Sequence, residues 1–175
     1  MKLNLRSARL PLALAAAAGL VACVANIDYS MDKDFVADTT ASSISTTVPV
    51  DLGQYKAVQD HKGGVEYLHF NSADISVTTI PATNKATKVT GKVSLRAAGS
   101  PADGSADVVV GQLTNFAISA TSSLHLPGSP ALDAFLLAQI KGPGQFSVAI
   151  TGATDGEAHF TLHAKINASL GYGVF

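Results

Sequence analysis

Apolar and polar side chains alternate almost without exception between residues 157 and 168. The apolar series is Ala158, Phe160, Leu162, Ala164, Ile166 and Ala168, and the polar series is Glu157, His159, Thr161, His163, Lys165 and Asn167. Because successive side chains of a strand point to opposite faces, the pattern predicts a strand with one buried and one solvated side. Such a strand belongs to a sheet whose apolar face is covered by a second layer.

The segment at 145–151 alternates in the same way. Its apolar residues are Phe146, Val148 and Ile150. Between the two segments lies Asp155-Gly156, a pair typical of tight hairpin turns. The sequence therefore predicts a C-terminal hairpin made of these two strands.

Shorter alternating patterns precede the hairpin. They predict strands at 44–52, 65–80, 87–97 and 107–119, the second interrupted near Asn71-Ser72. Pro49 lies within the first of them, and a proline in a strand favours an edge position because it lacks a backbone donor. Tyr55 and Val58 are three residues apart before Gly63-Gly64, which predicts a short helix over 54–62.

One longer helix is predicted over 129–141. Ser129 is a suitable N-cap, Pro130 fits the first helical position, and Gly142 follows as a stop. The apolar stripe is spaced by three and four residues and consists of Leu132, Phe135, Leu136, Leu137 and Ile140. The whole pattern predicts a mainly β fold, an antiparallel two-sheet sandwich of immunoglobulin-like type, with one short helix and one longer helix before the C-terminal hairpin.

The N-terminus has the layout of an export signal. Lys2, Arg6 and Arg9 precede the apolar run 10–20, which is shorter than the roughly 20 residues of a membrane-spanning helix. The run ends in Leu20-Val21-Ala22-Cys23, which resembles the lipobox of bacterial lipoproteins. The resemblance implies cleavage between Ala22 and Cys23, acylation of Cys23, and a cell-envelope location with the membrane as partner. The alternative is an ordinary secretory signal cleaved near Ala16 to Ala18, with an incidental cysteine.

Cys23 is the only cysteine, so the chain has no intramolecular disulfide to form. Two or three acyl chains hold a protein stably at a bilayer, whereas one chain holds it only marginally. Val24 follows the cysteine, where an aspartate would resemble an inner-membrane retention signal, and this favours the outer membrane. The predicted organisation is a signal peptide at 1–22, a lipidated acidic flexible tether at 23–43, and one sandwich domain at 44–175.

No catalytic residue, metal site or cofactor site is predicted. Asp32-Lys33-Asp34 lacks the glycine and closing glutamate of a calcium loop. His159 and His163 share the solvated side of their strand, but their α-carbons are about 13 Å apart, too far to chelate one ion alone. His61, His69 and His125 fall in different elements. No nucleophile elbow or zinc-protease motif occurs.

Two hypotheses for function follow. Without residues 1–22 the chain keeps nine basic and 13 acidic residues, a net charge of about −4 that argues against nucleic acid as a partner. The first hypothesis is a non-enzymatic, lipid-anchored envelope protein whose β-domain has a structural or protein-binding role. The second is a periplasmic carrier or sensor that holds a small apolar ligand between sheet and helix. The candidate lining residues for that ligand are Phe135, Leu136, Phe146 and Phe160.

Overall fold

The computed structural model describes residues 23–174. It contains eight strands: β1 (Cys23–Thr39), β2 (Ser43–Asp51), β3 (Val65–Thr79), β4 (Lys88–Ala97), β5 (Val108–Ala117), β6 (Ser123–Pro127), β7 (Gln145–Thr154) and β8 (Ala158–Val174). The helices are α1 (Lys56–His61) and α2 (Pro130–Lys141), with short 3-10 turns at Leu52–Gln54 and Lys62–Gly64.

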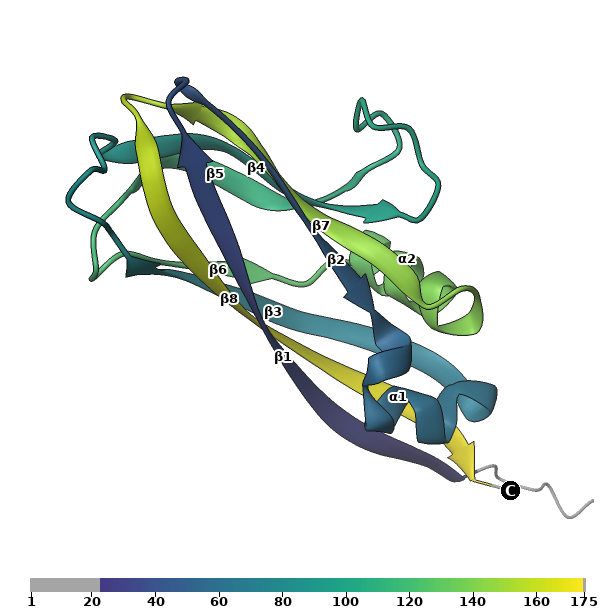
Figure 1. The fold of residues 1–175 in the computed structure, drawn as a ribbon. Coiled ribbons are helices and arrows are strands. Elements are labelled where there is room, and N and C mark those ends of the chain that lie inside the picture. The colour runs from purple at the N-terminus through teal and green to yellow at the C-terminus, as the bar shows by residue number, and fades with distance from the viewer. Residues whose placement is uncertain (1–22, 175) are drawn as a thin grey trace, which may run out of the picture.

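The strands form two four-stranded antiparallel sheets packed face to face (Figure 1). Their orders are β1-β8-β3-β6 and β2-β7-β4-β5. The predicted mainly β, two-sheet sandwich is confirmed. Its connectivity is that of a jelly roll, because consecutive strands β1 and β2 lie in different sheets, whereas immunoglobulin domains place their first two strands side by side. As predicted from Pro49, β2 is an edge strand.

The prediction of a C-terminal hairpin is wrong. Both strands exist, but β7 pairs with β2 and β4, whereas β8 pairs with β1 and β3. The turn between them crosses from one sheet to the other, and Asp155 in that turn accepts hydrogen bonds from the backbone amides of Thr87 and Lys88. Alternation of apolar and polar residues specifies which face of a strand is buried, but it does not specify the neighbouring strand. Two consecutive strands in different sheets therefore show the same pattern as the two strands of a hairpin.

The prediction of a flexible tether at 23–43 is also wrong. The segment forms β1, which pairs with β8 from Cys23↔Val174 to Thr39↔Ala158. Met31, Phe35 and Ala37 are buried in the core, while the aspartates that indicated a solvated spacer lie on the opposite, outer side of the sheet. The acidic residues therefore mark the polar face of a strand.

The core lies between the sheets and is closed on one side by α2. Leu132, Leu136 and Ile140 are at most 6% exposed, which confirms the predicted helix and its apolar stripe. Ser129 caps α2 by accepting a hydrogen bond from the Leu132 amide. Asp133 accepts one from the Phe70 amide and thereby fastens the helix to β3.

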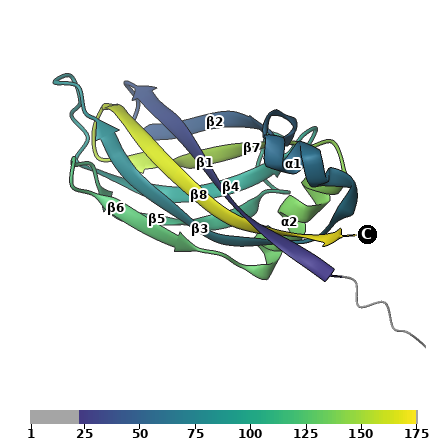
Figure 2. The same ribbon diagram turned by 90° about the horizontal axis from the view of Figure 1, so that it is seen from below.

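The two ends of the sandwich differ in construction. Figure 2 shows both helices gathered where β1 begins and β8 ends, which we call the helical end. The opposite end, called here the turn end, carries the short connections at 40–42 and 155–157, joined by a hydrogen bond from the Thr154 amide to the Ser42 carbonyl. The helical end thus holds the residues next to the predicted lipidation site.

Candidate functional site

Paired ionisable side chains cover the outer face of the β1-β8-β3-β6 sheet. Four carboxylates, three imidazoles and one lysine alternate across neighbouring strands in register. We call this surface the histidine–aspartate face; it consists of Asp32, Asp34, Asp38, Asp74, His125, His159, His163 and Lys165. The sequence predicted that His159 and His163 lie on a solvated face, and the structure confirms that position.

Each histidine of the face contacts a carboxylate from another strand. The Nδ1–Oδ1 distances are 2.6 Å for His159 and Asp38 and 2.6 Å for His125 and Asp74. Opposite charges directly across neighbouring strands contribute modestly to sheet stability. The face carries net negative charge when the imidazoles are neutral and approaches neutrality when they are protonated.

His163 is the most constrained imidazole of the face. Its Nδ1 lies 2.8 Å from Asp34 Oδ1, and its Nε2 lies 3.2 Å from Asp32 Oδ1. The hydrogen bond to Asp34 raises the pKa of His163 above its ordinary value, and the charges of Asp34 and Asp32 add to this effect. Both ring nitrogens are donors only in the imidazolium, so this geometry favours the charged form.

Ser76, His163 and Asp34 lie in one row across β3, β8 and β1. The residue types are those of a serine hydrolase triad, but a triad needs a histidine nitrogen free to take the serine proton. Here that nitrogen faces Asp32. The row lies on an open sheet face, and the sheet's backbone amides are engaged in strand pairing, so the geometry does not provide an oxyanion hole.

Within residues 23–174, no group of three or more histidine, cysteine, aspartate or glutamate side chains is arranged to hold a metal ion. Asp32 and Asp34 contact opposite nitrogens of the same imidazole, so they do not converge on one point. His69, which the sequence left unassigned, contacts Asp133 of α2, and His61 stacks on Tyr172. These two histidines join elements of the fold.

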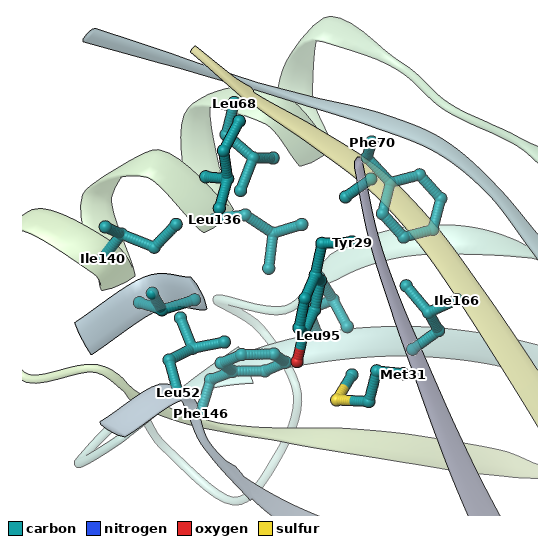
Figure 3. A pocket seen from close by; sticks show the side chains of 13 residues that line it. Tyr29, Met31, Leu52, Leu68, Phe70, Leu95, Leu136, Ile140, Phe146 and Ile166 are labelled. Atoms are coloured by element: carbon teal, nitrogen blue, oxygen red, sulfur yellow. The ribbon is translucent and has the colours of Figure 1, made fainter. Parts of the chain in front are cut away.

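The predicted apolar ligand lining is divided among separate places. Leu136 and Phe146 line a small cavity between the sheets, together with Tyr29, Met31 and other side chains (Figure 3). Phe135 packs edge-on against Phe146, with ring centroids 5.8 Å apart. Phe160 lies away from this cavity and is 2% exposed.

The cavity has a volume of about 30 Å³, enough for roughly one water molecule. Sites for small organic ligands are on the order of 300–1,000 Å³. The Tyr29 hydroxyl is buried and has no hydrogen-bond partner among the described residues (Figure 3). Its burial raises the phenol pKa, and the neighbouring Tyr55 adds to that shift.

The lipobox residues Leu20, Val21 and Ala22 lie outside the described residues. Cys23 is the first residue of β1 and pairs with Val174 near the C-terminus of β8. In the part of the chain that the structure describes, no helix has the length and apolar character to cross a membrane.

No protein-family model and no curated protein sequence matches this chain. The solved structures that resemble it weakly include three viral chains. A chain of desmodium yellow mottle tymovirus is 9% identical, with 98% of each chain covered and a TM-score of 0.34. A chain of turnip yellow mosaic virus is 10% identical, with 97% of this chain and 92% of the viral chain covered and a TM-score of 0.36. A Nora virus chain is 14% identical, with 87% and 62% covered and a TM-score of 0.37. Similarity this low says nothing about function.

Proposed function

We propose that this protein is a non-enzymatic lipoprotein of the bacterial cell envelope, anchored through Cys23, whose sandwich domain presents a rigid polar surface to an envelope partner. The observation that carries the proposal is the lipobox-like sequence at 20–23. Cys23 is already paired within β1, so the proposed mature chain contains the whole described fold. Cleavage there leaves every strand of residues 23–174 intact.

The close packing of the core supports a structural or protein-binding role rather than ligand transport. The interior cavity is about tenfold smaller than a carrier requires. The histidine–aspartate face is broad, charged and supported by a paired sheet, which suits recognition of a complementary protein surface. We propose the outer membrane as the anchoring membrane, because Val24 occupies the position after the cysteine.

Membrane fractionation tests the anchor. Wild type, Cys23→Ser and Val24→Ser are expressed in a bacterial host, and their distribution between membrane and soluble fractions is measured. We expect wild type and Val24→Ser in the membrane fraction and Cys23→Ser outside it. Val24→Ser is the matched control, because it changes the neighbouring residue of β1 and leaves the acylated position unchanged. A Cys23→Ser protein that stays in the membrane contradicts the proposal.

A further inference from the structure

The lipidation site and the folded domain have no spacer between them. Cys23 is paired with Val174, and Val24 with Gly173, so the residue proposed to carry the acyl chains is itself part of a strand. One extended residue spans only about 3.3 Å. On the proposed function, the lipid therefore holds the helical end within a few residues' length of the bilayer.

Side chains from three strands fasten this first part of β1. The Tyr67 ring extends from β3 across Gly171 of β8, and its hydroxyl hydrogen-bonds to Asn26 Oδ1 of β1. Tyr67, Gly171 and Asn26 lie in one register row. Nearby, His61 stacks on Tyr172 with ring centroids 4.1 Å apart. The Tyr67–Asn26 contact opposes the peeling of β1 into a tether, and the His61–Tyr172 stack holds α1 against the neighbouring β8.

The exposed groups at the helical end suit an interfacial position. Val24 is 40% exposed and Tyr67 is 42% exposed. A tyrosine combines an apolar ring with a polar hydroxyl and is enriched where membrane meets water. Three lysines at the same end are offset by three carboxylates, so the contact is apolar and aromatic rather than electrostatic; these residues are Lys56, Lys62, Lys141, Asp51, Asp60 and Glu66.

The charge of the histidine–aspartate face argues against a sandwich that lies on this face. Its carboxylates outnumber its permanent cations, and an anionic membrane surface repels them. From Cys23 along β1, Asp32 is about 30 Å away and Asp38 about 50 Å away at roughly 3.3 Å per residue. Both distances exceed the Debye length of about 8–10 Å, so in an upright protein these two carboxylates are largely screened from the membrane surface.

We propose that the acylated protein stands end-on, with its helical end seated on the bilayer surface and the histidine–aspartate face held upright above the membrane. This inference rests on the proposed lipid anchor. It assigns the bilayer surface itself as the second binding partner of the domain, through Val24 and Tyr67. Partners are then expected to approach the side of the sandwich or its turn end.

The chain has no tryptophan, so an introduced indole is a clean reporter. Acylated Tyr67→Trp and Val36→Trp are reconstituted into vesicles that contain lipids brominated near the top of the acyl chain. Val36 is the matched control because it is also exposed, at 59%, on β1 but near the turn end. We expect the indole at position 67 to be blue-shifted and to lose most of its emission, and the indole at position 36 to change little.

A third variant inserts a twelve-residue Gly/Ser linker between Cys23 and Val24 of Tyr67→Trp. The linker is expected to restore most of the emission while the protein still floats with the vesicles. Val24→Trp is the second reporter if Tyr67→Trp does not fold. Equal quenching at positions 67 and 36, or none at position 67 in a floating protein, overturns the end-on seat. Loss of acylation by intact mass, with no flotation, overturns the lipid anchor instead and the seat with it.

Discussion

Single residues on the histidine–aspartate face couple the fold to pH. His163 makes contacts with two carboxylates, and its raised pKa means that the folded state favours the imidazolium. A raised pKa contributes stability fully below the unfolded value of about 6.5, and that contribution disappears as the pH rises through the folded pKa. Asp155 at the turn end behaves in the opposite direction.

Asp34→Asn is expected to lower the pKa of His163, because it replaces the carboxylate responsible for the largest part of the shift. NMR titration of the His163 ring protons measures this pKa. The stability advantage of wild type over Asp34→Asn should be largest below about pH 6 and should shrink at higher pH. Asp51→Asn, which removes a remote carboxylate, is the control. An unchanged His163 titration in Asp34→Asn disproves the assignment.

Asp155 makes the stability of the fold depend on pH in the acidic range. Its carboxylate accepts hydrogen bonds from the Thr87 hydroxyl, the Thr87 amide and the Lys88 amide, and these lower its pKa to about 2. The contribution to stability is present above the unfolded pKa of about 4 and is lost as the pH falls through about 2. Asp155→Asn should therefore lower the melting temperature by a few degrees at pH 7, and the difference should vanish near pH 2. Glu66→Gln, at an exposed position, is the control and should leave the melting temperature unchanged at both pH values. A melting temperature of Asp155→Asn that stays below that of wild type at pH 2 would rule out the linkage.

Phe160 tests the packing between the sheets. It is 2% exposed, and Phe160→Ala should reduce the free energy of unfolding by about 3–5 kcal/mol, since it removes apolar contacts and leaves a cavity. Urea denaturation measures the loss. Val36→Ala, on an exposed position of the adjacent β1, should cost below about 0.5 kcal/mol. Similar costs for the two variants would show that Phe160 is not in the core.

Among the elements, β1 is the long edge strand of its sheet, and its sequence limits pairing with other chains. Lys33 has the same strand parity as the buried Met31 and Phe35, and its ammonium lies 6.0 Å from the centroid of the Tyr55 ring. An inward-pointing lysine on an edge strand discourages the addition of another strand. The edge of the second sheet carries Pro49, which has the same effect.

The row of Tyr67, Gly171 and Asn26 joins three strands and is testable as a unit. A β-carbon at Gly171 would lie 2.2 Å from the Tyr67 ring, so Gly171→Ala should destabilise the protein by about 1 kcal/mol or more. In Gly171→Ala combined with Tyr67→Ala, that clash is gone, and the two effects should be non-additive by roughly 0.5–3 kcal/mol. Chemical denaturation of the four proteins gives the coupling. Strict additivity would show that ring and glycine do not contact.

The sequence predicts both helices and most strands, but it misses β1 and β6 and it predicts the pairing of strands poorly. Helix α2 was predictable because its cap, proline and stop are local signals. The β7–β8 turn was misassigned because alternation records burial and not pairing. The aspartates opposite His159 and His163 come from a segment more than 120 residues away, so their pairing with histidine depends on strand register that no local pattern specifies.

On the scale of the whole molecule, the protein is a two-sheet jelly roll with its proposed anchor at one end and a charged sheet face along its side. If Cys23 is acylated as proposed, the anchor places the helical end near the membrane, and the pairing of β1 keeps that end close to it. The proposed recognition of a partner is assigned to the surface, because the cavity between the sheets measures only about 30 Å³. Each of these conclusions about placement depends on the acylation of Cys23.

Intact-mass spectrometry of the protein purified from a bacterial host tests that claim most directly. We expect a chain that begins at Cys23 and carries the added mass of two or three acyl chains. Cys23→Ser should lack this addition. A chain cleaved elsewhere, such as near Ala18, or one that begins at Cys23 with no added mass, would contradict the lipid anchor and leave a secreted sandwich domain in its place.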